Sequence, residues 1–280
     1  MMNIHISASE LAIITGHNTY RDKSELYVKY WKKYWKSDYD RVLTKLSSLD
    51  KKTKLPETSS ETVQRIAKEN NISATELSKL YMASKEKDTG KMQAKKDAVL
   101  NSVLSQLPES QKKDFAKAAN SVAFTGFGTR NETNAVKIYE GITGNKVDTL
   151  NKYFHDDIFI IEEFEGKPDV WSVGGKIDGI FTNLDGTKTI LEIKNRVNGL
   201  FKKLRDYEKV QCFAYMFMLN HKCVHLAECY KKKEGSEMHI IPIEWDDTFW
   251  FNSVISPVST FVDDFYEFLK SDNRKLEMIS

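Results

Sequence analysis

The sequence predicts an α/β protein in which a central β-sheet is flanked by helices and a helical subdomain is inserted after the first helices. Three observations support this fold class. β-rich stretches bounded by Gly and Pro gather between residues 158 and 245, and helical patterns precede, interrupt and follow them. Residues 36–122 are rich in Lys, Ser, Glu and Thr and almost lack aromatics. The hydrophobic content of 40% is enough for a substantial core.

Residues 7–35 are expected to form two helices. Ser7 or Ser9 is suited to cap the first, because a serine hydroxyl accepts a hydrogen bond from a backbone N–H of the first turn. The segment GHNTY, residues 16–20, interrupts the helical pattern. Aromatic residues then recur at helical spacing between residues 26 and 35, which indicates packing in the core.

The stretch TVQRIAKENNISATELSKLYMASK, residues 62–85, has the pattern of helix, short turn and helix. This spacing is similar to that of DNA-reading helix-turn-helix motifs, but the pattern is short and common, so a helical insertion packed on the core is favoured. Two more helices are expected near 94–106 and 109–122. The chain is therefore divided into N-terminal helices of the core (1–35), a helical insertion (36–122) and the remaining core with its C-terminal helix (123–280).

The second half of the chain alternates between helical and strand patterns. Residues 126–143 are expected to form a loop that feeds a helix, and residues 203–219 form a strongly apolar helix. The C-terminal segment is expected to form one or two amphipathic helices. The predicted strands are 158–166, 170–183, 188–196, 224–233 and 238–245.

Composition excludes several classes of protein. The charged fraction of 29% and the lack of any apolar run of about 20 residues exclude a membrane-spanning chain. We expect no signal peptide, and three cysteines without metal-type spacing fit a reduced intracellular compartment, either the cytoplasm or, in a eukaryotic host, the nucleus. The histidines also lack zinc spacing. A net charge of +2 means that any nucleic-acid binding must come from local basic patches.

The segment GGKIDGIFTNLDGTKTILEIKNR, residues 174–196, carries the chemistry. Glu192 and Lys194 point to one face of a strand while Ile193 points to the other, and pairing with the preceding strand places Asp178 beside Glu192. Two neighbouring carboxylates repel each other, and Mg²⁺ (or Mn²⁺) would offset that repulsion, with the carbonyl of Ile193 as a further ligand. Lys194 would contact the attacking water or the phosphate. The alternative is a solvent-facing Glu192–Lys194 pair.

Four blocks in a fixed order support the catalytic interpretation. They are ISASELAIITGHNTYR (6–21), GFGTRNETNAVKIYEGITGNKV (126–147), KIDG followed by LEIK, and YEKVQCFAYMFML (207–219). Together they resemble the PD-(D/E)xK nuclease superfamily and, within it, the lambda-exonuclease-like or YqaJ-type viral recombinases. The resemblance implies a restriction-endonuclease-like core with a central mixed β-sheet. Ile177 stands where that family often has proline, but metal chemistry needs only the carboxylate that follows.

The resemblance also implies roles for individual residues. Asp178 and Glu192 would bind the metal with the Ile193 carbonyl, and Glu132 would complete the site directly or through water. Lys194 would be the catalytic lysine, and Gln211 would orient it or the water. Tyr215 lies one helical turn after Gln211 and would support it. The residues expected to contact DNA are Ser9, Arg21, Arg130, Arg196, Lys202, Lys203, Arg205 and Tyr215.

The leading hypothesis is a Mg²⁺-dependent exonuclease that degrades double-stranded DNA from its ends in the 5′-to-3′ direction, in viral or phage-type recombination or repair. The resemblance implies a single-strand annealing protein as partner and a ring-shaped homotrimer. A structure-specific or single-strand DNA endonuclease on the same fold is the alternative among enzymes. The alternative from another class is a noncatalytic module that binds DNA or a partner through residues 36–122.

Overall fold

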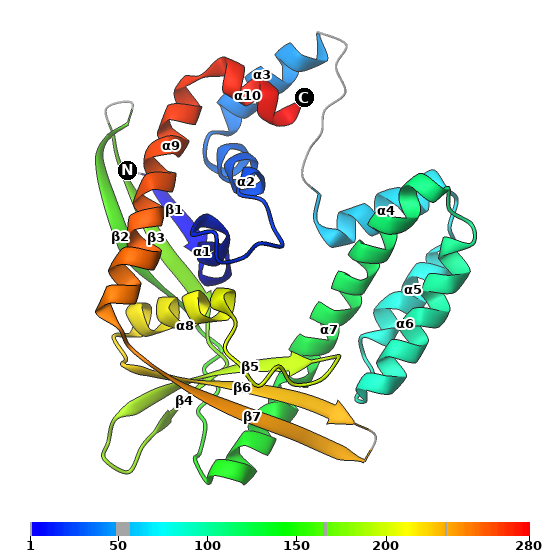
Figure 1. The fold of residues 1–280 in the computed structure, drawn as a ribbon. Coiled ribbons are helices and arrows are strands. Elements are labelled where there is room, and N and C mark those ends of the chain that lie inside the picture. The colour runs from blue at the N-terminus through cyan, green and yellow to red at the C-terminus, as the bar shows by residue number, and fades with distance from the viewer. Residues whose placement is uncertain (1, 49–56, 165–166, 233) are drawn as a thin grey trace.

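The computed structural model describes residues 2–48, 57–164, 167–232 and 234–280 and shows an α/β fold (Figure 1). Within these residues the strands form a three-stranded sheet of order β1-β3-β2 and a four-stranded sheet of order β4-β5-β6-β7. Both sheets are mixed, because β1–β3 and β5–β6 pair in parallel and the other pairs are antiparallel. The predicted fold class is confirmed, with the strands divided between two sheets that helices flank.

The helices and strands are β1 (Met2–Ser7), α1 (Ala8–Ile14), α2 (Ser24–Tyr34), α3 (Lys36–Ser47), α4 (Ser59–Glu69), α5 (Ala74–Ala83), α6 (Thr89–Leu104), α7 (Glu109–Thr143), β2 (Tyr153–Phe164), β3 (Lys167–Lys176), β4 (Gly179–Thr182), β5 (Lys188–Arg196), α8 (Asp206–Leu219), β6 (Cys223–Lys232), β7 (Gly235–Glu244), the π-helix η1 (Phe249–Ile255), α9 (Ser256–Lys270) and α10 (Asp272–Ile279). None of the helices in the described ranges combines the length and apolar character needed to cross a membrane.

Strand β5 is covered by a helix on each face. Ile190 belongs to the large core cluster that includes residues of α1, α8 and α9, whereas Leu191 and Ile193 pack with apolar residues of α7. Figure 1 shows α8 and α7 on opposite sides of the four-stranded sheet. The alternation predicted for this strand is confirmed, and it turns Glu192 and Lys194 to the side of α8.

The aromatic residues of α2 lie in the core, as their spacing predicts. Tyr30 and Trp31 are fully buried, and the ring of Tyr30 contacts Trp171 of β3 and Phe265 of α9. Ser7 is the N-cap of α1, in a capping box with Glu10. The strand before that cap, β1, was not predicted, because its partner β3 lies more than 160 residues further along the chain.

The expectation of a loop at the start of residues 126–143 is wrong, because α7 is one continuous helix from Glu109 to Thr143. Gly126 and Gly128 suggested a break, since glycine lowers helix propensity. Packing explains Gly126. A Cβ at this position would lie 2.9 Å from the Cβ and Oγ of Ser84, at the end of α5. The glycine therefore lets α5 approach α7 closely without breaking the helix.

Helices α4 to α6 pack with the first half of α7 around a core of their own, at the right of Figure 1. Helix α3 behaves differently, because Tyr39, Val42 and Leu46 pack in the main core. Arg41 of α3 also forms an ion pair with Asp272 of α10. The division at residues 36 and 122 stays a proposal, with α3 packed on the main core and α7 crossing the second boundary.

Two glycines of α7 provide a matched test of this packing. Gly126→Ala should lower the free energy of unfolding by about 1–3 kcal/mol, because the added methyl group forces Ser84 to shift. Gly128→Ala should raise it by about 0.5–1 kcal/mol, because nothing lies within 4 Å of the new methyl group and alanine favours the helix. Urea unfolding followed by circular dichroism measures both. Equal changes in the two variants would contradict the close contact between α5 and α7.

Candidate active site

A pocket of about 520 Å³ opens where β5, α7 and α8 meet. It brings together residues that are far apart in the sequence, from the helix α7, the junction of β3 and β4, the strand β5 and the helix α8. Its lining includes all six side chains that the resemblance assigned to the reaction: Glu132, Asp178, Glu192, Lys194, Gln211 and Tyr215.

The pairing of β4 with β5 places Asp178 beside Glu192. Gly179 is opposite Leu191 in this antiparallel pair, so the residue before β4 lies next to the middle of β5. The Asp178 carboxylate accepts a hydrogen bond from the backbone N–H of Ile193 at 2.6 Å. A side chain at Gly179 would collide with Val147, since an added Cβ would lie 2.3 Å from its Cγ1. The absence of a side chain at Gly179 thus allows Val147 to pack closely against the start of β4.

Lys194 is the centre of a set of hydrogen bonds between β5 and α8. Its ammonium donates to Oε1 of Glu192 at 2.6 Å and to Oε1 of Gln211 at 3.0 Å. The amide nitrogen of Gln211 lies 3.2 Å from Oε1 of Glu192 and 2.6 Å from the hydroxyl of Tyr215. Since the Glu192 side chain is only 5% exposed, this is no solvent-facing ion pair. The side chain of Gln211 thus links Lys194 of β5 to Tyr215 on its own helix.

Burial and mutual repulsion shift the pKa values of the carboxyl groups upward. Burial raises the pKa of Glu192 to about 7; Lys194 opposes this shift, and Asp178 adds to it. Burial also raises the pKa of Asp178 to about 6. The hydrogen bond from the N–H of Ile193 lowers this pKa, and the charge of Glu132 raises it. The pKa of Glu132 is raised by burial and by Glu192. Without a cation, these groups are protonated more readily than ordinary carboxyls.

Lys194 shifts in the direction that keeps its charge. Burial lowers the pKa of the ammonium, but the neighbouring groups, Glu192 first and then Glu208, together raise that pKa by more, so the net shift is upward. Lys194 is therefore a cation at neutral pH. It can donate hydrogen bonds to a phosphate oxygen or to a water, and it is unsuited to remove a proton.

The donor set of the pocket fits a hard divalent cation. Carboxylates of Glu132, Asp178 and Glu192 line one cavity, and burial together with mutual repulsion raises their pKa values, a cost that a cation would offset. The described part of the chain contains no group of three His, Cys, Asp or Glu side chains already drawn together at ligand distances. Asp178 accepts a hydrogen bond from the N–H of Ile193, and Glu192 accepts one from Lys194.

The residues expected to contact DNA lie in different environments. Ser9 is exposed at the start of α1, and Lys202 and Lys203 are exposed after β5. Arg205 is half-buried, with its guanidinium 4.1 Å from the ring centre of Phe201. Arg130 is exposed and hydrogen-bonds Ser84 and the carbonyl of Gly126.

Two of these expectations need correction. Arg196 is only 10% exposed and is paired with Glu208 and Glu228, so its guanidinium is not available to a phosphate. The sequence could not show this, because the two carboxylates come from α8 and β6. Tyr215 is buried and hydrogen-bonded to Gln211, which supports its positioning role and not a surface contact with DNA.

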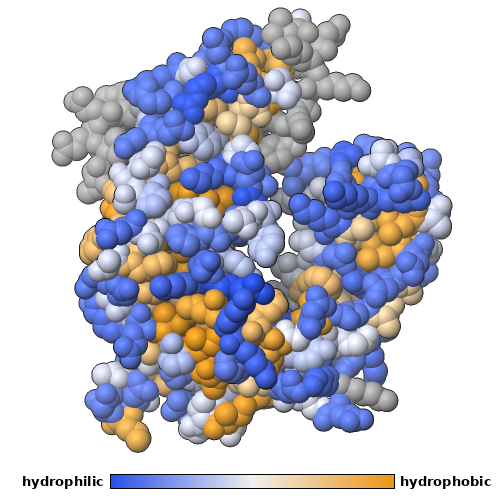
Figure 2. Space-filling view, in the orientation of Figure 1, coloured by the Kyte–Doolittle hydropathy of each residue, from blue (hydrophilic) through white to orange (hydrophobic). Residues whose placement is uncertain are grey.

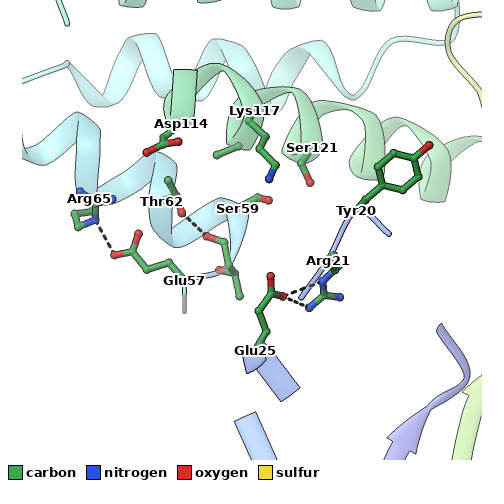
Figure 3. Close-up of a pocket in the computed structure, with 12 residues that line it drawn as sticks. Tyr20, Arg21, Glu25, Glu57, Ser59, Thr62, Arg65, Asp114, Lys117 and Ser121 are labelled. Atoms are coloured by element: carbon green, nitrogen blue, oxygen red, sulfur yellow. Dashed lines mark hydrogen bonds and ion pairs between the residues drawn. The ribbon is translucent and has the colours of Figure 1, made fainter. Parts of the chain in front are cut away.

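Arg21 lies in a second, larger pocket of about 700 Å³, between the loop before α2 and the helices α4 and α7 (Figure 3). The charged groups there are largely paired with one another: Arg21 with Glu25 at 2.8 Å, and Arg65 with Glu57 at 2.7 Å. Figure 2 shows hydrophilic residues along the indentation between the main body and the helical subdomain, which consists of α4 to α6 and the first half of α7. Its paired charges make this pocket a poorer candidate for catalysis than the smaller one.

Sequence reasoning missed two kinds of residue at the site. Lys176, two residues before Asp178, lines the pocket. Its charge lowers the pKa of Glu132, whereas burial and Glu192 raise that pKa. Glu208 is buried near Lys194 and helps to raise the pKa of that ammonium. Glu208 could have been noticed as an acidic residue one turn before Gln211 on an apolar helix. Lys176 gave no comparable signal.

A comparison with protein families shows the family of the chain that carries this site. The profile described as YqaJ-like viral recombinase domain matches residues 65–223. The chain belongs to this family. The match contains Glu132, Asp178, Glu192, Lys194 and Gln211, and membership supports a nuclease that acts in recombination. It begins within α4 and so includes α5 and α6, which belong to the proposed insertion at 36–122 and lie in none of the four blocks that carry the resemblance.

Solved structures show a more distant likeness. An alkaline exonuclease, LHK-Exo, from Laribacter hongkongensis matches with 18% identity, 70% of this chain, 91% of that chain and a TM-score of 0.39. Its complex with dAMP matches with 18% identity, 71% and 92% coverage and the same TM-score. A protein named SSO0001 matches with 16% identity, 55% and 67% coverage and a TM-score of 0.34. No curated protein sequence matches the chain significantly.

The raised pKa of Asp178 predicts how stability changes with pH in the metal-free protein. An acid whose pKa is higher in the folded state stabilises the fold at low pH, and that contribution is lost as pH rises through about 6. Asp178→Asn should therefore be more stable than the unsubstituted protein at pH 8 by on the order of 2 kcal/mol, and about equal to it near pH 4. Urea unfolding in EDTA at both pH values measures the difference.

Asp185 supplies the control for this prediction. It is exposed in the turn before β5, and hydrogen bonds from Thr187 lower its pKa. Asp185→Asn should give no stabilisation at pH 8. If both variants gained the same stability, the buried cluster would not be the cause.

Proposed function

We propose that the chain is a Mg²⁺-dependent DNA exonuclease that degrades double-stranded DNA from its ends in the 5′-to-3′ direction, in viral or phage-type recombination or repair. One observation carries the proposal: the Lys194 ammonium is held by Glu192 at 2.6 Å and by Gln211 at 3.0 Å, in a pocket that Asp178 and Glu132 also line. Metal-dependent phosphodiester hydrolysis uses these features: an ammonium group that can donate to the phosphate, carboxylates that can bind a metal, and a cavity that admits the substrate.

The metal ligands in this proposal are Asp178, Glu192 and the carbonyl of Ile193, with Glu132 completing the set. Mg²⁺ (or Mn²⁺) bound there would lower the pKa of a coordinated water and polarise the scissile phosphate. The three carboxylates supply hard oxygen donors, and their burial and mutual repulsion both favour binding of a divalent cation.

Lys194 and Gln211 stabilise the developing charge in this proposal. The ammonium stays protonated at neutral pH, so it can donate to an oxygen of the phosphate or to the attacking water. Gln211 accepts one ammonium hydrogen and is itself held by Tyr215. These contacts keep the Lys194 ammonium in place, and none of them requires the ammonium to lose its proton.

Contacts with DNA are proposed for polar and basic residues outside the pocket. Lys202 and Lys203 are exposed in the segment between β5 and α8, and Ser9, Arg21, Arg130 and Arg205 are further candidates. Contacts with the phosphate backbone give affinity without sequence preference, which suits an enzyme that must accept every sequence. The family resemblance further supports a 3′ overhang passed to a single-strand annealing protein, and a ring-shaped trimer.

The direct test uses linear duplex DNA labelled at one 5′ end, with Mg²⁺ or with EDTA. The protein should release labelled mononucleotide early in the reaction with Mg²⁺ and none with EDTA. Lys194→Ala should lower the rate roughly 100- to 1,000-fold, the loss typical when one donor to a transition-state oxygen is removed. Denaturing gels and thin-layer chromatography identify the products. Lys270→Ala, which removes an exposed lysine of α9 paired with Glu267, is the matched control.

Other outcomes would change the proposal in defined ways. Internal fragments, or cleavage confined to single strands or junctions, would replace the exonuclease with an endonuclease on the same site. DNA binding without cleavage under any metal would support a binding module. Release of the 5′ label only at the end of the reaction would reverse the polarity.

Salt dependence tests the loop after β5. If Lys202 and Lys203 each contact a phosphate, Lys202→Ala with Lys203→Ala should reduce the slope of log K against log of salt concentration by about 1.8, because each contact adds about 0.9. Fluorescence anisotropy with a labelled duplex, in Ca²⁺ to prevent cleavage, measures this slope. An unchanged slope would remove this loop from the proposed DNA path.

A further inference from the structure

A buried network of three charged residues lies next to the reactive lysine. The Arg196 guanidinium donates to both carboxylate oxygens of Glu208 at 2.8 and 2.9 Å, and to Oε1 of Glu228. The side chains are 10%, 1% and 0% exposed, respectively. None of the three lines the active-site pocket, so none is placed to touch a substrate.

The contact between Arg196 and Glu208 joins the same strand and the same helix as the contact between Lys194 and Gln211. Lys194 and Arg196 are two residues apart on β5 and face the same side of the strand. Gln211 and Glu208 are three residues apart on α8 and so share a helix face. Lys194–Gln211 and Arg196–Glu208 are thus successive cross-links between the same strand and the same helix.

Glu228 ties a third element into this arrangement. It lies opposite Lys194 in the parallel pair of β5 and β6, and it also accepts the backbone N–H of Lys202 at 2.8 Å. The ring of Phe201 lies between the guanidinium groups of Arg196, at 4.3 Å, and Arg205, at 4.1 Å. Arg196 therefore joins the strand to the helix, and through Glu228 and Phe201 it is also connected to the loop between them.

Stability alone gives no reason for such a network. Removing charges from water is costly, and buried ion networks can often be replaced by apolar residues without loss of stability. Bidentate arginine pairs do, however, fix the distance and orientation of the elements they join. A site in which one ammonium must face both Glu192 and Gln211 needs that fixed orientation.

We propose that Arg196, Glu208 and Glu228 are positioning residues, which lock α8 against β5 so that Gln211 holds Lys194 in its reactive position. This inference rests on the proposed nuclease function. It makes a specific statement about how the three residues act: their effect on the reaction passes through the contact between Gln211 and Lys194.

A double-mutant cycle tests this statement. Glu208→Gln is isosteric and weakens the cross-link to Arg196. It should lower kcat roughly tenfold with little change in KM, a coupling within the range of groups that share one network. In a Gln211→Ala background, the same substitution should cost less than twofold, because the contact it supports is already gone. Equal losses in both backgrounds, or no loss in either, would overturn the proposal.

A second measurement is independent of catalysis. Reaction of Lys194 with an amine-reactive reagent, followed by peptide mass spectrometry, should be several-fold faster in Glu208→Gln than in the unsubstituted protein, whereas Lys203 should react equally in both. An unchanged rate at Lys194 would also overturn the proposal. Inactivity of the unsubstituted protein would contradict the proposed nuclease function, while this measurement would still decide whether the network positions Lys194.

Arg41→Gln is the matched control for both measurements. It removes an arginine that joins α3 to α10 through Asp272, far from the pocket lining. It should leave kcat and the reactivity of Lys194 unchanged. Thermal unfolding of every variant shows whether the fold is retained.

Discussion

The pairing of the Lys194 ammonium with the buried Glu192 carboxylate and with Gln211 is the interaction on which the candidate site depends. A buried carboxylate is tolerated only when it is paired and hydrogen-bonded, so the strand that carries Glu192 and Lys194 must lie at a fixed distance from the helix that carries Gln211. Apolar packing provides this constraint, because Ile190 packs on the side of α8 while Leu191 and Ile193 pack against α7. The reactive polar groups are positioned by an otherwise apolar strand.

The same burial creates an electrostatic cost that points to the function. Three carboxyl groups share one cavity, and their pKa values rise because charge is disfavoured there. A protein selected for stability alone would have replaced at least one of them. Clusters of perturbed acids in a cavity, next to a cation that keeps its proton, are typical of catalytic sites. Membership of the family of YqaJ-like viral recombinase domains agrees with this interpretation.

The helical subdomain is connected to the reactive strand through specific contacts. Asn195 donates to the carbonyl of Gly128 in α7 at 2.9 Å, and Gln93 of α6 donates to the carbonyl of Val197 at 2.7 Å. Helix α7 belongs to the cores of both parts, because its first half packs with α4 to α6 and its second half with β5. These contacts join the subdomain to the end of β5, next to Arg196 and the loop that follows it.

The sequence by itself determined the features that depend on local periodicity. Alternation placed Glu192 and Lys194 on one face of a strand, and helical spacing placed Gln211 and Tyr215 on one face of a helix. The family resemblance added Glu132 and joined these residues into the set that lines one pocket. Only the tertiary structure decided the rest. The parallel partner of β1, the close approach of Ser84 that keeps Gly126 in a helix, and the two acids that bury Arg196 all come from distant segments. Periodicity describes which face a residue occupies, but burial of a polar group depends on what the fold brings opposite that face.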